Sequence, residues 1–128
     1  MSKMLIYHIC RRQDWQNALE MGLYHGSVDD RTDGFLHFST AQQVAESAGR
    51  HKAKVVDLML ITVDANDFGS DLKWELSRGG QLFPHLYGSL SISKVLSVCD
   101  LPLAEDGFHQ FPDGIVPWRP PRGESSNV

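Results

Sequence analysis

Ionisable side chains interrupt several short apolar stretches of this chain. His37 lies in the segment GFLHFST (residues 34–40), Glu75 follows a tryptophan, and His85 lies in the segment FPHLYG (residues 83–88). Burying a polar group without a partner costs about 1–3 kcal/mol, so strands with a purely structural role would carry Val or Leu at these positions. Imidazoles on short strands, followed by hydroxyl or glycine residues, instead predict the lining of a ligand cleft.

The spacing of these residues places several of them on common strand faces. Residues two apart in a strand point to the same side, so His85 shares a face with Tyr87, and His37 shares a face with Ser39. His8 lies on another predicted strand. If these strands are neighbours, the five side chains can line one cleft. The alternative is that His8 and His85 are satisfied polar groups at a sheet edge.

Glu75 has two interpretations. A carboxylate beside the indole of Trp74 can have a raised pKa and take part in acid–base chemistry, or it can act as an electrostatic anchor. Alternation along a half-exposed strand would instead place Trp74 inward and Glu75 outward. The sequence leaves both interpretations open.

Metal and nucleophilic chemistry fit the sequence less well. The six histidines show neither the His-Glu-x-x-His spacing nor paired Cys-x-x-Cys knuckles, so no metal is predicted, although three imidazoles on three strands leave a His-rich site geometrically open. The Gly-x-Ser-x-Gly elbow of serine hydrolases is absent. Neither Cys10 nor Cys99 has the polar surroundings of a reactive thiolate, and we expect both to be reduced core thiols.

One tripeptide matches a phosphoesterase pattern. The two-histidine phosphoesterases use a His-x-Ser sequence twice to hold a phosphate and move its proton, and His37 with Ser39 forms one such sequence. At the matching spacing after His85 stands Tyr87, which can donate a hydrogen bond but is not a small hydroxyl. A His-based phosphoesterase acting on a cyclic phosphate or a 2'-phosphate is therefore an alternative function.

The composition is that of a soluble globular domain. The chain has 128 residues and a net charge of -4, which argues against a footprint for duplex nucleic acid. No apolar run approaches the roughly 20 residues of a membrane-spanning helix, and no secretory signal is recognised. The one basic cluster, residues 50–54, closes a predicted helix, where the helix dipole favours cations; phosphate binding is the alternative. We expect a cytoplasmic monomer or weak homodimer that binds a small molecule.

The apolar patterns predict six strands and two short helices. The strands lie at residues 4–10, 35–38, 55–63, 72–76, 83–87 and 95–99, and the nearly continuous run 55–63 predicts a central strand covered on both faces. One helix has Asp14 as its N-cap, buries Trp15, Ala18 and Leu19, and ends at Gly22. The other is capped by Ser39 or Thr40 and ends between residues 48 and 50.

This order of elements favours an α+β fold, because the helices come early and strands dominate the remainder. Residues 26–34 are polar and turn-rich, which predicts a solvated loop. After residue 100 the pattern decays, and the prolines and glycines of residues 112–128 predict an irregular C-terminal tail. We therefore expect one domain over residues 1–111, followed by that tail.

In combination, these segments resemble a small bacterial family, domain of unknown function 952. The resemblance covers about residues 4–100 and is carried by Tyr7-His8-Ile9, the helix with Trp15, Ala18 and Gly22, the segments GFLHFST and FPHLYG, and Trp74-Glu75. That family is grouped with the ADP-ribosyltransferase-like fold. The resemblance implies a bent, split β core with two short helices and a cleft that holds NAD.

The resemblance also implies roles for single residues. By position, His8 contacts the nicotinamide-side ribose, and the second element of the site consists of His37, Ser39 and Thr40. The third element is Glu75 or His85. With His85 in this position, the site is similar to that of the RNA 2'-phosphotransferases, which use NAD as a phosphate acceptor, although the chain lacks a clear set of arginines for gripping an RNA phosphate.

We therefore expect a domain that binds NAD or a related nucleotide in a His-lined cleft and transfers ADP-ribose or a phosphate. The expected catalytic residues are His37, Glu75 and His85, and the expected cofactor-binding residues are His8, Ser39, Thr40 and Tyr87. The alternatives are a non-catalytic module for a small metabolite or anion, and the phosphoesterase described above.

Overall fold

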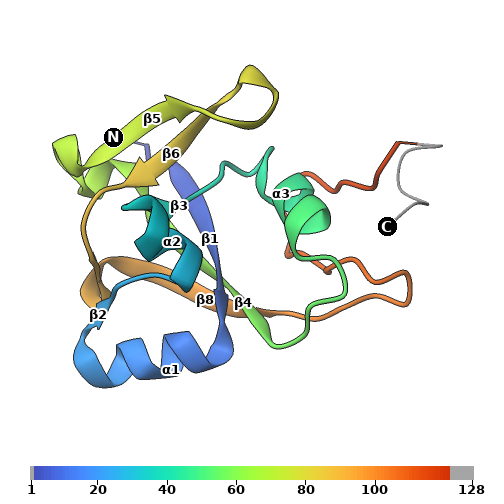
Figure 1. The fold of residues 1–128 in the computed structure, drawn as a ribbon, viewed down its shortest axis with the longest axis horizontal. Coiled ribbons are helices and arrows are strands. Elements are labelled where there is room, and N and C mark those ends of the chain that lie inside the picture. Colours follow the sequence, from blue (N-terminus) through green and yellow to red (C-terminus); the bar gives the residue numbers. More distant parts are fainter. Residues whose placement is uncertain (1, 122–128) are drawn as a thin grey trace.

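Eight strands form two three-stranded antiparallel sheets and a two-stranded ribbon in residues 2–121, the part of the chain that the computed structural model describes (Figure 1). In the first sheet, β4 (Leu58–Asp64) lies between β1 (Leu5–Arg11) and β8 (Val95–Leu101). In the second sheet, β6 (Leu82–Leu86) lies between β3 (Leu36–His37) and β5 (Leu72–Leu76). The ribbon pairs β2 (Leu23–Tyr24) with β7 (Leu90–Ser91).

Three α-helices connect these strands, one more than the sequence predicts: α1 (Arg12–Met21), α2 (Val28–Asp33) and α3 (Val44–His51). Short 3-10 turns follow at Ala65–Asp67, Gly69–Asp71, Arg78–Gly80 and Ile92–Lys94. Antiparallel sheets with three helices make this a small α+β domain, which confirms the predicted fold class. None of the described helices is both long and apolar enough to cross a membrane.

The first helix begins earlier than predicted. α1 starts directly after β1 with Arg11 as its N-cap, so Asp14 lies in the first turn, where its carboxylate suits the positive end of the helix dipole. Trp15 is buried as expected, whereas Leu19 is 53% exposed. Gly22 ends the helix as predicted, with a φ of 78° that favours glycine.

The prediction of a loop at residues 26–34 is wrong, because α2 occupies most of this segment. Ser27 is the N-cap, and its Oγ accepts the backbone N–H of Asp30 at 3.2 Å. The carboxylate of Asp30 accepts the backbone N–H of Ser27 at 2.7 Å, which completes a capping box. The Asp30 residue is only 3% exposed, so the predicted solvated acidic turn contains a buried carboxylate at its centre.

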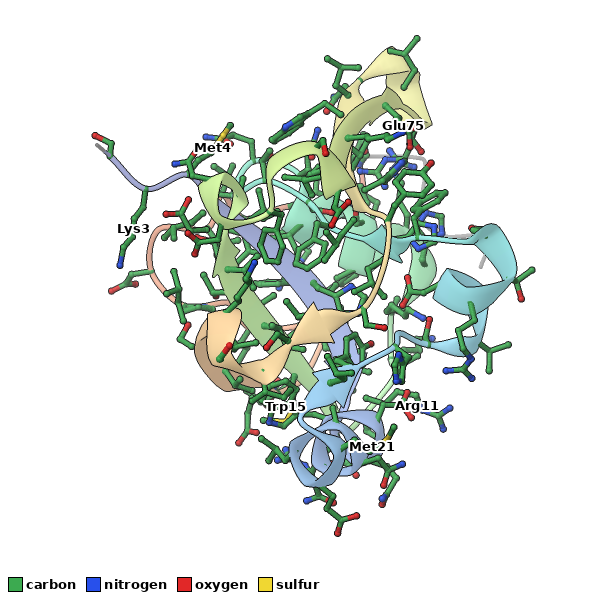
Figure 2. All side chains as sticks on the ribbon, turned by 90° about the vertical axis from the view of Figure 1, so that its left-hand side faces the viewer. Lys3, Met4, Arg11, Trp15, Met21 and Glu75 are labelled. Atoms are coloured by element: carbon green, nitrogen blue, oxygen red, sulfur yellow. The ribbon has the colours of Figure 1, made fainter. Side chains whose placement is uncertain are left out.

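β4 is the covered central strand that the apolar run predicts. Every residue of this strand except Met59 is buried, and β1 and β8 pair with it on its two sides. The strand begins three residues later than predicted, after Asp57, which has a φ of 63°. At opposite ends of the molecule, Trp15 of α1 packs into the core and Glu75 lies on the β5–β6 hairpin (Figure 2).

The two sheets meet beside β3. The backbone of Tyr7 in β1 exchanges two hydrogen bonds of 2.8 Å with the backbone of Ser39, and the N–H of Phe38 donates to the carbonyl of Pro84 in β6 at 3.0 Å. The short segment from His37 to Ser39 therefore bridges β1 and β6. This bridge brings histidines from three strands toward one side of the fold.

The chain after β8 has little regular structure but packs against the domain. Ile115 is buried, and the N–H of Val116 donates to the carbonyl of Ala41 at 3.0 Å. Trp118 packs against the core cluster that includes Leu58 and Leu60. Residues 122–128 of the predicted tail lie outside the described residues, and the division at residue 111 stays a prediction.

Candidate functional site

A cavity of about 570 Å³ lies where β1, α2, β3, α3 and the β5–β6 turn meet. Four residues selected from the sequence line it: His8, His37, Ser39 and His85. The histidines come from β1, β3 and β6, which neighbour one another through the bridge at Ser39 and the pairing of His37 with His85. Their chemical roles stay predictions, but the three imidazoles share one hollow.

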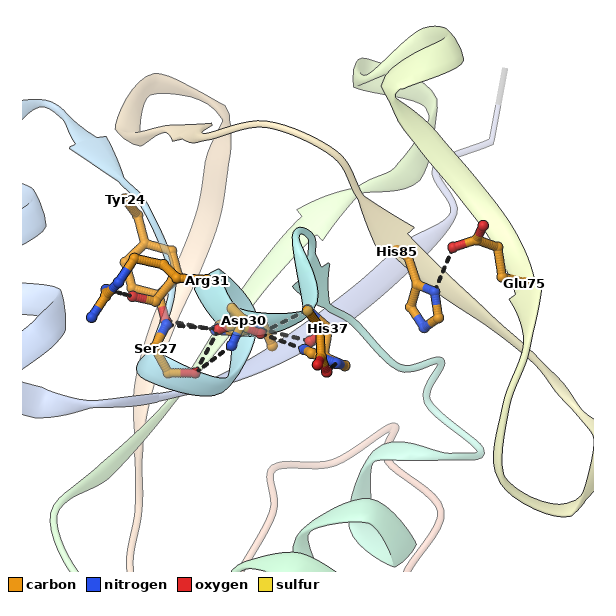
Figure 3. A network of polar contacts seen from close by, with 10 residues as sticks. Tyr24, Ser27, Asp30, Arg31, His37, Glu75 and His85 are labelled. Carbon is orange, nitrogen blue, oxygen red and sulfur yellow. Dashed lines mark hydrogen bonds and ion pairs between the residues drawn. The ribbon is translucent and has the colours of Figure 1, made fainter.

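Asp30 holds the centre of the polar network along this cavity (Figure 3). Its Oδ2 accepts the backbone N–H of Ser27 at 2.7 Å and the Ser27 hydroxyl at 2.9 Å. Its Oδ1 accepts the backbone N–H of His37 at 3.1 Å and Nδ1 of the same residue at 2.5 Å. Burial favours the neutral acid, but the hydrogen bonds from His37, the nearby His8 and the Ser27 amide outweigh it and hold the pKa of Asp30 well below its usual range.

His37 is an imidazolium in this geometry. Its Nδ1 contacts Asp30, and its Nε2 lies 2.9 Å from Oδ2 of Asp33. A carboxylate only accepts, so both ring nitrogens must donate, and only the protonated ring can do this. The hydrogen bond to Asp30, opposed by partial burial and supported by Asp33, raises the pKa of His37 above its ordinary value.

His8 is a neutral imidazole directly behind this pair. Its Nδ1 lies 2.7 Å from the backbone carbonyl of His37 and donates to it. Its Nε2 then accepts the hydroxyl of Tyr24 at 2.7 Å. Burial lowers the pKa of His8, although the charge of Asp30 3.6 Å away acts in the opposite direction. His8 therefore connects β1 to β3, and both of its ring nitrogens are occupied by hydrogen bonds within the protein.

His85 and Glu75 are hydrogen-bonded to each other. Nδ1 of His85 donates to Oε1 of Glu75 at 2.8 Å (Figure 3), and the Tyr87 hydroxyl donates to the same oxygen at 2.7 Å. The hydrogen bonds from Tyr87 and His85 lower the pKa of Glu75, which is a carboxylate at neutral pH. Nε2 of His85 makes no hydrogen bond to any residue between 2 and 121, so it is available to a ligand.

Phe35 holds the two site imidazoles at their separation. Its ring stacks on His85 with centroids 4.0 Å apart, and it contacts His37 at 4.6 Å. The centroids of His37 and His85 are 5.8 Å apart. The imidazolium and the free Nε2 nitrogen therefore lie side by side at the same wall of the cavity.

Cations and hydroxyls line other parts of the cavity. The cations are Arg11, Lys52 and Arg78, and the serine and threonine residues are Ser27, Thr32, Ser39, Ser47 and Ser77. Arg78 comes from the turn between β5 and β6, and its Nη1 donates to Oγ of Ser47 on α3 at 3.1 Å. Lys52 belongs to the basic cluster that the sequence places at a helix end.

Three selected residues do not line the cavity: Thr40, Glu75 and Tyr87. Glu75 is connected to the cavity by its hydrogen bond to His85, and Tyr87 in turn donates to Glu75. The N–H of Thr40 donates to Oε1 of Gln43 at the start of α3. Sequence reasoning missed Asp30 and Arg78. The Ser-x-x-Asp capping pattern at residues 27–30 could have revealed Asp30. No local pattern predicts that Arg78, in a hairpin turn, contacts α3.

The described residues offer little for metal or thiol chemistry. Between residues 2 and 121, no group of three or more His, Cys, Asp and Glu side chains is arranged to hold a metal ion. Cys10 and Cys99 are both free thiols. Burial raises the pKa of Cys10 to about 11, so this thiol is not a nucleophile at neutral pH.

Comparisons with known proteins place this geometry in a family. Solved structures similar to the chain include two crystal structures and one solution NMR structure of protein CC0527 from Caulobacter crescentus, each 44% identical in sequence. The crystal structures match 83% of this chain and 93% of that protein, with TM-scores of 0.81 and 0.80. The NMR structure matches 83% of this chain and 91% of its own, with a TM-score of 0.76.

No curated protein matches the chain. The model of one family, described as protein of unknown function (DUF952), matches residues 9–98. This span covers most of the domain and includes His37, Glu75 and His85. The chain therefore belongs to the DUF952 family of proteins of unknown function.

Proposed function

We propose that the cavity binds NAD or a related dinucleotide and that the protein is an ADP-ribosyltransferase-like enzyme that transfers ADP-ribose. The observation that carries this proposal is the free Nε2 of His85, which faces a cavity of about 570 Å³ beside the imidazolium of His37. Cavities of roughly 300–1,000 Å³ are typical of sites for cofactors and other small molecules. The cations of the cavity suit the negative charges of a dinucleotide.

The site residues have complementary tasks in such a transfer. Cleavage of the nicotinamide–ribose bond releases neutral nicotinamide with the bonding electron pair and leaves positive charge on the ribose, which an incoming hydroxyl then attacks. Nε2 of His85 can take the proton of that hydroxyl. Glu75, which does not line the cavity, positions the ring through its hydrogen bond to Nδ1. The His37 ring, whose two nitrogens are held by Asp30 and Asp33, presents a fixed, partly exposed cationic face to the bound ribose.

Calorimetry with NAD tests binding. We expect wild-type protein to give binding heat and His85→Ala to bind at least tenfold more weakly. His25→Ala is the matched control, because His25 is exposed, contacts Ser89 and does not line the cavity. Absence of binding heat for wild-type protein at millimolar NAD would overturn the proposal. Binding without nicotinamide release over a long incubation would support the non-catalytic module instead.

A second candidate is transfer of an RNA 2'-phosphate to NAD. The specific observation in its favour is that the cavity contains Arg11, Lys52 and Arg78, a cationic set that is not adjacent in the sequence. Incubation of a 2'-phosphorylated oligonucleotide with and without NAD separates the possibilities. Loss of the phosphate only with NAD supports this phosphotransfer, whereas loss without NAD supports a His-based phosphoesterase.

A further inference from the structure

We propose that one corner of the cavity is a phosphate subsite and that the ligand is held as a ribose phosphate unit. The corner consists of Arg78, Ser47 and Ser39, with Lys52 also lining the cavity. We call Arg78, Ser47 and Ser39 the phosphate corner. The inference rests on the proposed function, because it names the part of the nucleotide that this site recognises.

Hydrogen bonds already assemble the phosphate corner. Nη1 of Arg78 donates to Oγ of Ser47 at 3.1 Å, and Oγ of Ser47 lies 3.4 Å from Oγ of Ser39. Packing of the Arg78 guanidinium over the Phe83 ring, 5.1 Å from its centroid, holds its plane in place. A planar guanidinium next to two hydroxyls presents several donors to one site, which is what phosphate oxygens require.

Arg78 is not neutralised by a close ion pair. Its Nε lies 3.7 Å from Oε2 of Glu46, whereas the guanidinium of Arg50 lies 2.7 Å from the same oxygen. Glu46 therefore shares its charge between two arginines, and it does not line the cavity. Positive charge from Arg78 is available to an anion there.

The distribution of charge in the cavity fixes the direction of the ligand. Asp29, Asp30 and Asp33 line the cavity beside His37, so an anion is repelled there and favoured at the phosphate corner. Ser39 of the corner follows His37 by two residues, and both residues line the cavity. A phosphate at the corner therefore leaves the attached ribose to extend toward the part of the cavity lined by His37 and His85.

Titration calorimetry with three small probes tests the subsite: ribose 5-phosphate, ribose and inorganic phosphate. We expect wild-type protein to bind ribose 5-phosphate more tightly than either other probe, because both ends of the site are then occupied. Arg78→Ala removes the charge-assisted hydrogen bonds, so this variant should bind ribose 5-phosphate about tenfold to a hundredfold more weakly than wild type. Arg119→Ala is the control, since Arg119 pairs with Asp106 outside the cavity.

Ser47→Ala provides a second variant if Arg78→Ala does not fold, and it should also bind ribose 5-phosphate more weakly than wild type. Equal binding of ribose 5-phosphate by wild type and both variants would overturn the subsite, as would equal binding of ribose and ribose 5-phosphate. Ribose 5-phosphate that binds through Arg78 while NAD does not bind would sink the NAD proposal and leave the subsite intact. NAD that binds Arg78→Ala and Ser47→Ala as well as it binds wild type would sink the subsite alone.

Discussion

Oδ1 of Asp30 lies 2.5 Å from Nδ1 of His37 and also accepts the backbone N–H of that residue at 3.1 Å. The two hydrogen bonds join α2 to β3 and give each partner a charge that it would not carry alone. The carboxylate stays ionised although it is buried, and the hydrogen bond to Asp30 raises the pKa of the imidazole above its ordinary value. Because both the ring and the backbone of His37 are held, its orientation in the cavity follows from Asp30.

We predict that Asp30→Asn destabilises the protein by about 2–4 kcal/mol, because the change removes the buried counter-ion of His37 and disturbs the capping box of Ser27. Urea unfolding followed by circular dichroism measures this difference. Asp29→Asn is the matched control, since Asp29 is exposed and adjacent in sequence, and it should change the free energy of unfolding by less than about 0.5 kcal/mol. Equal effects of the two variants would contradict the central place of Asp30.

The free energy of unfolding should reach its maximum near pH 6.5, the ordinary pKa of histidine, because His37 and His8 titrate in opposite directions. Hydrogen bonding raises the pKa of His37 in the fold. The stability that His37 contributes is therefore fully present below pH 6.5 and is lost as the pH rises through the pKa of His37 in the folded protein. Burial lowers the pKa of His8, so the unfolded chain binds a proton first and stability falls as the pH drops below 6.5. His51, whose pKa burial also lowers, acts in the same direction as His8.

Urea unfolding between pH 5 and pH 9 checks this shape. In His37→Gln the alkaline decline should largely disappear while the acid decline remains, because only the raised pKa has been removed. A His37→Gln curve parallel to that of wild type would show that His37 is not protonated more readily in the fold.

The protonation states of His8, His37 and His85 give a third prediction. At pH 7, long-range proton–nitrogen NMR spectra should show His37 with both ring nitrogens protonated, and His8 as the neutral form with the proton on Nδ1. Glu75→Ala should remove the hydrogen bond that fixes the His85 ring and shift its nitrogen signals, while the signals of His8 stay unchanged. His37 signals typical of a neutral ring would refute the double carboxylate contact.

Sequence patterns are informative about this fold where one residue's neighbours in the chain decide its environment. The apolar run of β4 predicts a covered strand because both faces of a central strand need apolar side chains. Period two predicts that His37 shares a face with Ser39 and that His85 shares a face with Tyr87. That the two strands are neighbours, with His37 paired to His85, comes from the register in the structure.

The remaining features depend on partners that are distant in sequence. α2 has a polar sequence that does not show a helical apolar pattern. Asp30 can be buried there because the imidazolium of His37 compensates its charge and the amide and hydroxyl of Ser27 bond its other oxygen. Glu75 and His85 look like competing candidates in the sequence because their hydrogen bond crosses two paired strands. Arg78 reaches α3 from a hairpin turn, a contact that no local periodicity encodes.

The last prediction concerns the packing of the C-terminal segment on α3. A Cβ at Gly49 would overlap the indole ring of Trp118, which cannot move without losing its contacts with Arg50 and Phe108. Gly49→Ala should therefore destabilise wild-type protein by about 1–3 kcal/mol, although alanine favours a helix. In a Trp118→Ala background the overlap is gone, and the same change should stabilise by up to about 1 kcal/mol through helix propensity alone. Urea unfolding of the four proteins measures this reversal of sign, and stabilisation by Gly49→Ala in both backgrounds would show that Trp118 does not pack on α3.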